Sequence, residues 1–218
     1  KLKNREKESF LVWTTTPWTL PGNTALALNP DLVYVKVSFE NHFYYVGQDQ
    51  FEKVFKDKDA QVVETFQGSD LVGLEYIPVF DYFVHTEIAK NENIWKVYAG
   101  DFVTAGAGTG IVHIAPSFGE DDASLAKKYS IPSVKHVASD GVFIPEVAHF
   151  AGVQVKPKEN HQATDVEIIK YLAHNHVLFA KEKITHSYPH CYRCETPLLY
   201  YGLPSWFIRV QDYKKRML

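Results

Sequence analysis

Residues 13–23 read Trp13-Thr14-Thr15-Thr16-Pro17-Trp18-Thr19-Leu20-Pro21-Gly22-Asn23. They follow an apolar run at 10–12 that predicts a buried strand. Pro17 has no N–H for a sheet and favours extended backbone at Thr16, so we expect the strand to end here. Hydroxyl groups therefore gather where a strand enters a loop, which is where binding residues often lie on a rigid scaffold. Threonine is also a good strand former, and composition alone favours that plainer interpretation.

Composition limits the chain to one sizeable core or two small ones. It has 218 residues, of which 45% are hydrophobic and 14% aromatic. A net charge of −3 argues against a broad surface that coats nucleic acid, although it allows a local basic patch. Two cysteines exclude a disulfide framework and fit a reducing compartment. The sequence contains no apolar stretch of membrane-spanning length, and its charged start does not resemble a signal peptide.

Short strands dominate the expected secondary structure, and their spacing predicts a barrel or sandwich rather than a βαβ fold. The patterns predict strands at 24–28, 32–39, 42–47, 61–66, 95–100, 111–114, 177–180, 184–186, 198–201 and 206–210. A short amphipathic helix is expected at 48–56. Two longer helices are expected to begin with capping boxes, Ser117 with Glu120 and Thr164 with Glu167.

A second notable block runs from Gly108-Thr109-Gly110 through residue 122. A dinucleotide-binding loop would need a helix to open from the glycines, but Ile111 to Ile114 predict a strand, so we reject that interpretation. Asp121 and Asp122 then fall at or near the first turn of the next helix. The helix dipole stabilises carboxylates there, and this role alone is enough to explain Asp121.

Both blocks resemble the editing domain of isoleucyl-tRNA synthetase, an insertion called connective polypeptide 1 (CP1). A third block, at 186–193, resembles the strand that leads out of that insertion, and all three blocks stand in the family's order. The resemblance implies an α+β, mostly β fold with a closed β-barrel core and peripheral helices. Residues 1–218 would then be a single editing domain excised from a larger class I synthetase, with 1–8 as a linker and 212–218 as the start of the return. Residues 129–183 resemble the eukaryotic cytosolic type.

The resemblance implies hydrolysis of valine from tRNA for isoleucine, with valyl-adenylate as a second candidate substrate. Isoleucyl-tRNA synthetase is itself the standard example of the need for such a step: one methylene gives only about 1–3 kcal/mol of discrimination, so a second, hydrolytic site is required. Pro17 favours this family over the related valyl and leucyl editing domains, which typically carry arginine at that position. The family signatures of the synthetic site, HIGH and KMSKS, are absent.

Eight residues match family positions with a role in editing. The resemblance implies that Asp122 pairs with the α-ammonium of the amino acid and that His113 limits the size of the pocket. A role for His113 as general base is the less favoured alternative. The catalytic set is Thr14, Thr15, Thr16 and Asp122, and the substrate-binding set is Trp18, Thr19, Asn23 and His113. Threonine hydroxyls can position a water molecule or donate to a developing oxyanion.

We expect no cofactor and no metal within this chain, although the parent enzyme would use ATP and Mg²⁺. Cys191 and Cys194 form only half of a zinc pattern, and His186 and His190 could complete it, but a metal-free segment is favoured. The expected partners are tRNA for isoleucine and the rest of the parent synthetase. We expect a cytoplasmic monomer that does not bind membranes.

Two rival functions stay open at this point. One is a non-catalytic module that only holds the 3′ end of tRNA, which predicts binding without turnover. The other is a free-standing hydrolase for another ester or amide. That function requires an activated nucleophile, and the sequence has no G-x-S-x-G motif.

Overall fold

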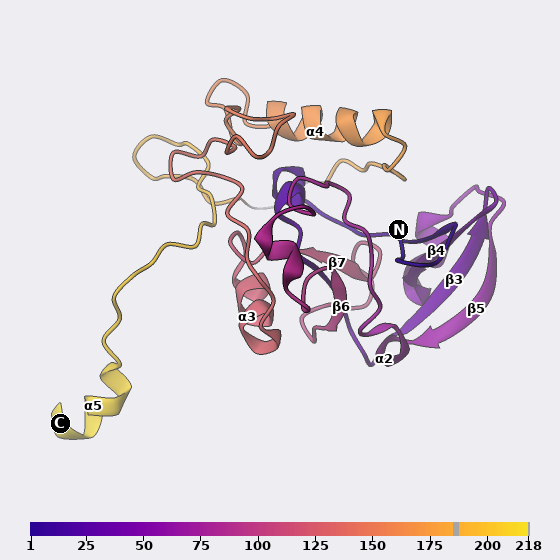
Figure 1. The fold of residues 1–218 in the computed structure, drawn as a ribbon, viewed down its shortest axis with the longest axis horizontal. Coiled ribbons are helices and arrows are strands. Elements are labelled where there is room, and N and C mark those ends of the chain that lie inside the picture. Colours follow the sequence, from indigo (N-terminus) through magenta and orange to yellow (C-terminus); the bar gives the residue numbers. More distant parts are fainter. Residues whose placement is uncertain (185–187, 218) are drawn as a thin grey trace.

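The computed structural model describes residues 1–184 and 188–217, and the strands of these residues form two sheets (Figure 1). The four-stranded sheet has the order β1-β4-β3-β5, and the three-stranded sheet has the order β6-β2-β7. The strands are β1 Glu8–Phe10, β2 Ala25–Leu28, β3 Val33–Phe39, β4 His42–Gly47, β5 Gln61–Gln67, β6 Lys96–Ala99 and β7 Ile111–Ile114. These confirm the strands predicted between residues 24 and 114.

The smaller sheet is built around β2, whose four residues are all buried. β2 pairs parallel with β6 and antiparallel with β7, so that Leu26 lies opposite His113. In the larger sheet, β3 and β4 form the predicted antiparallel hairpin, and β1 adds parallel to β4. A core between the sheets contains Leu26, Leu28, Tyr34, Tyr45, Val97 and Ile111.

The segment after β1 crosses from one sheet to the other. The Leu11 N–H donates to the Tyr45 carbonyl of β4 at 3.0 Å, and the Trp13 N–H donates to the Ile111 carbonyl of β7 at 3.1 Å. The threonines therefore begin where the chain has just reached the edge of the three-stranded sheet. This crossing fixes the position of the threonine segment relative to β7.

The prediction of a closed β-barrel is wrong for the described residues, because their strands form two separate sheets. Three predicted strands, at 177–180, 198–201 and 206–210, are not strands in the structure, and the one at 184–186 lies mostly outside the described residues. Residues 11–13 connect β4 with β7, but among the described residues no strand pairing joins the outer strands β5 and β6. β-rich sequence is not enough, because a strand also needs a partner edge.

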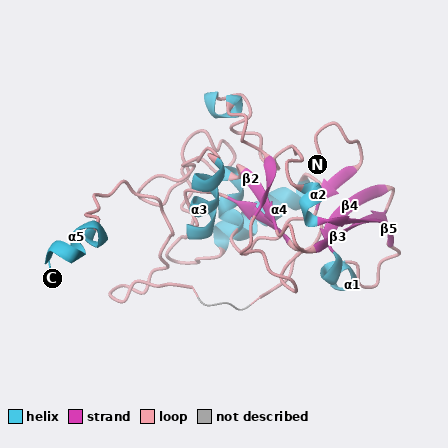
Figure 2. Ribbon diagram, turned by 90° about the horizontal axis from the view of Figure 1, so that it is seen from below, coloured by secondary structure: helices cyan, strands magenta, loops and turns pink. Residues whose placement is uncertain are grey.

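The helices lie around the sheets and in the C-terminal part of the chain (Figures 1 and 2). The α-helices are α1 Phe51–Val54, α2 Gly68–Leu71, α3 Glu120–Tyr129, α4 Ala163–His174 and α5 Val210–Met217, and the 3-10 helices are η1 Pro17–Gly22, η2 Gln48–Gln50 and η3 Glu87–Lys90.

The two predicted capping boxes are wrong. Gly119 and Gln162 occupy the N-cap positions, while the Ser117 hydroxyl bonds to Ser133 and the Thr164 hydroxyl donates to the Gln154 carbonyl.

A second core lies between η1 and α4. It includes Trp18, Phe118, Phe143, Phe150 and Ile168.

At the N-terminal end, Leu2 is buried and forms a β-bridge with Tyr76, so the segment predicted as a linker packs onto the domain. Near the other end, α5 lies away from the body in both views (Figures 1 and 2). Among the described helices, none has the length and hydropathy needed to cross a membrane.

Candidate active site

The threonine segment forms a tight turn that leads into η1. The Thr16 N–H donates to the Thr14 hydroxyl at 3.1 Å, and Pro17 starts the helix, where its missing N–H costs nothing. Thr14 and Thr16 are partly buried, and Thr15 is exposed. The Trp18 N–H donates to the Asp165 carboxylate of α4 at 3.2 Å, so α4 caps the start of η1.

A chain of hydrogen bonds joins η1 to β7. The Thr19 hydroxyl donates to the Thr16 carbonyl at 2.8 Å and lies 2.9 Å from His113 Nε2. On the other side of the ring, Asn23 Nδ2 lies 3.0 Å from His113 Nδ1 and also donates to the Ala25 carbonyl. Four of the predicted residues, Thr16, Thr19, Asn23 and His113, therefore belong to one network.

Burial keeps His113 neutral. The residue is 7% exposed, and burial lowers the pKa of His113 to about 3, with a smaller contribution from His136. Both ring nitrogens already have partners. A neutral imidazole that is held on both sides can form a rigid wall, but it has no free nitrogen with which to accept a proton from water.

Asp122 lies in the first turn of α3, and its carboxylate folds back toward the end of β7. Its Oδ1 accepts a hydrogen bond from the Ala115 N–H at 2.6 Å, and Gly119 leaves the space that the other oxygen occupies. Burial raises the pKa of Asp122 to about 6, and hydrogen bonds from backbone N–H groups partly oppose this shift. Among the described contacts, no hydrogen bond joins Asp122 directly to the threonines or His113.

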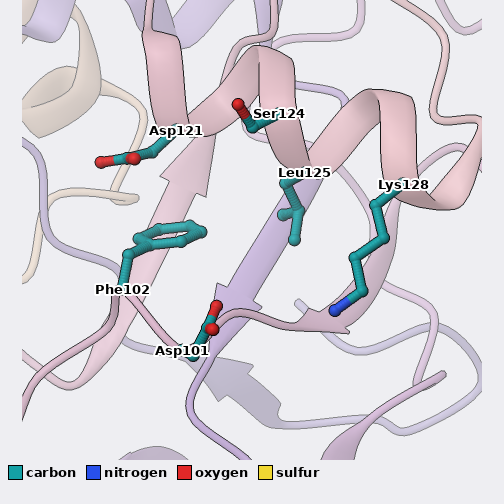
Figure 3. Close-up of a pocket in the computed structure, with 6 residues that line it drawn as sticks. All are labelled: Asp101, Phe102, Asp121, Ser124, Leu125 and Lys128. Atoms are coloured by element: carbon teal, nitrogen blue, oxygen red, sulfur yellow. The ribbon is translucent and has the colours of Figure 1, made fainter.

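The neighbouring Asp121 lies in a different environment. It is exposed and lines a surface pocket with Asp101, Phe102, Ser124, Leu125 and Lys128, as Figure 3 shows. The two adjacent carboxylates are thus separated by the geometry of the helix, one folded toward β7 and one facing solvent. Asp121 is the natural control for any experiment on Asp122.

Trp18, predicted as a wall of the substrate pocket, is 2% exposed and packs in the core. Its ring makes an edge contact with Phe118 at a centroid distance of 5.3 Å, and its carbonyl is 3.0 Å from His136 Nε2. His136 is itself fully buried, and burial lowers its pKa to about 4. The side chain of Trp18 therefore anchors η1 in the core of the domain.

Two residues of this site carry no local signal in the sequence. The Tyr76 hydroxyl donates to Asn23 Oδ1 at 2.6 Å, and Asp165 both caps η1 and forms an ion pair with Lys156. Tyr76 is 53 positions from its partner, and Asp165 is 147 positions from Trp18. Only the three-dimensional fold brings these residues to the site.

The cysteine pair forms a turn near the C-terminal end. Both cysteines are free, and Cys194 Sγ lies 3.0 Å from the Thr196 hydroxyl. Within the described part of the chain, no group of three or more histidine, cysteine or acidic residues is placed to hold a metal ion. His186, a candidate fourth ligand, lies outside the described residues, so the metal-free interpretation stays a prediction.

Comparison with solved structures defines the class of fold. The structure titled "The crystal structure of GlLeuRS-CP1" superposes with a TM-score of 0.60 at 15% sequence identity, over 81% of this chain and 85% of that one. The described architecture is therefore that of a synthetase CP1 domain. A scan against models of protein families finds no match.

Sequence relatives identify the family more closely. The chain is 39% identical over all 218 residues to "Isoleucine--tRNA ligase" from Clostridium tetani and 42% identical to that from Bacillus thuringiensis, and it spans 20% of each. It is a homologue of one segment of these isoleucine–tRNA ligases, and its fold is similar to that of the LeuRS CP1 structure. Both relatives are bacterial, and the eukaryotic cytosolic type stays a prediction.

Proposed function

We propose that this chain hydrolyses the ester that joins valine to the 3′ end of tRNA for isoleucine. The observation that carries the proposal is the sequence identity of 39–42% to isoleucine–tRNA ligases over all 218 residues of this chain, combined with the CP1 fold. A synthetase for isoleucine needs a hydrolytic step because its synthetic site separates isoleucine from valine by only one methylene.

Asp122 is the proposed partner of the α-ammonium group. A half-buried carboxylate with a pKa near 6 gains from a cationic ligand, since the ligand offsets the cost of burying the charge. A charge-assisted hydrogen bond of this kind is stronger than a neutral one. Uncharged analogues of valine would lose this interaction.

The threonines are the proposed groups around the ester. Thr14 and Thr16 lie at the turn before η1, and Thr15 is open to solvent, so water and substrate can reach this segment. In the proposed step, a water oxygen attacks the ester carbonyl while the threonine hydroxyls donate to the oxyanion. The bond from the carbonyl carbon to the ribose oxygen then breaks, a proton of the attacking water passes to that ribose oxygen, and valine leaves as the free acid. Both ring nitrogens of His113 are already hydrogen-bonded, which supports a size-limiting role for this residue and argues against its acting as a general base.

The proposal extends to a second substrate, to the partners and to the oligomeric state of the domain. Valyl-adenylate is a second candidate substrate, and the partners are tRNA for isoleucine and the remainder of a synthetase. We further propose that the domain acts as a monomer in the cytoplasm. The hydrolytic step needs no cofactor within this chain, while ATP and Mg²⁺ would serve synthesis elsewhere in the parent enzyme.

Release of radiolabelled valine from tRNA for isoleucine tests the proposal, with the wild type compared with Asp122→Ala and with Asp121→Ala as the matched control. We expect turnover by the wild type and by the control, and a loss of at least tenfold in Asp122→Ala, about 1.4 kcal/mol or more of transition-state stabilisation. Binding of the tRNA without any release of valine would contradict the proposal and favour the non-catalytic alternative.

A further inference from the structure

Helix α3 begins at a glycine that the stability of the helix does not require. Gly119 occupies the N-cap position with a φ of −155° and a ψ of 145°, and no side chain caps the first turn there. This is extended backbone, which residues other than glycine also adopt. Serine, threonine, asparagine or aspartate at an N-cap would provide an oxygen for a free N–H group of the first turn. Neither backbone geometry nor helix capping therefore explains the glycine at this position.

The space beside Gly119 is taken by the side chain of Asp122. A Cβ atom at position 119 would overlap Asp122 Oδ2 and lie 2.8 Å from its Cγ, and the three atoms nearest to it all belong to this one side chain. Such a contact is too short for two carbon atoms, whose optimal separation is about 3.5–4.0 Å. The carboxylate can therefore lie here only because residue 119 has no side chain.

The conformation of Asp122 differs from the one that its place in the helix favours. It is the third residue of α3, where an acidic side chain in a capping box accepts from the N–H group of the N-cap residue. Asp122 Oδ1 instead accepts from the Ala115 N–H at 2.6 Å, one residue beyond the end of β7. The carboxylate thus passes over the N-cap residue and reaches the segment that leads out of β7.

A second conformation, turned toward solvent, is open to this side chain. Burial raises the pKa of Asp122 to about 6, the bond from the Ala115 N–H opposes the rise, and the charge of Asp121 adds to it. A buried carboxylate regains hydration when it turns to solvent, where the side chain of Asp121 already lies. The inward position is therefore occupied against a cost, and a small steric change is enough to abolish it.

We propose that Gly119 is a positioning residue that holds the Asp122 carboxylate in its inward position, where it can pair with the α-ammonium group of the substrate. A methyl group at position 119 would displace the carboxylate toward solvent and leave the fold intact. This inference rests on the proposed function for its effect on turnover. The position of the carboxylate can be measured without any substrate, so the two claims can fail separately.

Carbon-13 NMR of the Asp122 carboxyl group, followed against pH, measures that position in the wild type, Gly119→Ala and Gly202→Ala. Gly202 is the matched control, because a Cβ atom there would come no closer than 3.6 Å to its nearest neighbour, the Ser117 carbonyl oxygen. We expect the pKa of Asp122 to stay near 6 in the wild type and in the control, and to fall toward the ordinary value of 3.8 in Gly119→Ala. An ordinary pKa in the wild type, or an unchanged pKa in Gly119→Ala, would overturn the inference.

Valine release provides the second readout, with Asp122→Ala and the double variant Gly119→Ala/Asp122→Ala added. If Gly119 acts through the carboxylate alone, Gly119→Ala should lose at least about tenfold in rate, and the double variant should lose no more than Asp122→Ala does. Full activity in Gly119→Ala, or a further loss of rate in the double variant, shows that Gly119 does not act through Asp122 and overturns the inference.

The double variant also decides the case in which Gly119→Ala does not fold. Replacing Asp122 by alanine removes the overlapping atoms, so we expect the double variant to fold as Asp122→Ala does. Failure of the double variant to fold would overturn the inference. If the wild type releases no valine, the proposed function fails, and the pKa of Asp122 in Gly119→Ala alone decides whether Gly119 holds the carboxylate inward.

Discussion

Asp122 holds a charge where the surroundings disfavour it. Its carboxyl has a pKa of about 6 in the fold, compared with an ordinary value of 3.8, because burial outweighs the hydrogen bond from the Ala115 N–H. At neutral pH the carboxylate is mostly ionised, and that ionisation costs stability. Binding residues often carry such a cost, since they are shaped for a ligand rather than for the empty fold.

Asp122→Asn should therefore make the protein more stable at pH 7.5. Asparagine keeps the oxygen that accepts from Ala115 and removes the buried charge, so we expect a gain of about 1–3 kcal/mol in the free energy of unfolding. Urea unfolding measures this, with Asp121→Asn as the exposed control, which should change by less than about 0.5 kcal/mol. A less stable Asp122→Asn at this pH would show that the carboxylate stabilises the fold after all.

The site could be predicted only partly from the sequence at this scale. The resemblance identified Thr16, Thr19, Asn23 and His113, which the structure joins in one network. It did not identify Tyr76 or Asp165, because their identities matter only once distant segments meet. Trp18 matched the family string, yet its side chain is buried in the core.

At the scale of elements, α4 holds the threonine segment through one carboxylate. Asp165 caps η1 and pairs with Lys156, and both side chains are 13% exposed. Burial raises the pKa of Asp165, and Lys156 opposes that shift. A pair this well shielded from water should cost more to break than a surface pair.

A double-mutant cycle on Asp165→Asn and Lys156→Met measures this coupling. Each single substitution leaves its partner shielded and unpaired, so we expect a loss of about 1–3 kcal/mol for each and a smaller loss for the double variant than their sum. Glu167→Gln on the exposed face of the same helix is the control, since its bond to Lys170 is open to solvent. Additive losses would mean that the ion pair contributes nothing to the docking of α4.

The elements also show where local pattern fails. The hairpin of β3 and β4 followed from two β-rich runs with a short turn between them, which is local information. The runs at 198–201 and 206–210 are equally rich in β-forming residues, but in the described structure they find no strand edge to pair with. The closed barrel depended on such long-range pairing, so it could not be deduced from propensity.

For the whole molecule, two buried histidines couple stability to pH. The pKa of His113 is lowered to about 3 and that of His136 to about 4, whereas both would bind protons near 6.5 in the unfolded chain. The unfolded state thus binds more protons as the pH falls from 6.5 toward 4, and acid favours unfolding in that range. Asp122 opposes this trend between about pH 6 and its ordinary value of 3.8, because there the folded state binds the extra proton.

The free energy of unfolding should therefore fall between pH 6.5 and 4.5, by about 1.4 kcal/mol per pH unit for each net proton taken up. Asp122→Asn removes the opposing group, so its stability should fall more steeply than that of the wild type. Urea denaturation at several pH values compares the two slopes. Equal slopes would mean that Asp122 does not titrate in this range.

The central claim is that the molecule removes valine and spares isoleucine. The most direct measurement compares the initial rates at which the wild type hydrolyses valyl- and isoleucyl-tRNA, both made with tRNA for isoleucine. We predict that valine is released at least about tenfold faster, because the pocket must reject one additional methylene. Equal rates for the two amino acids, or no hydrolysis of either, would contradict the claim.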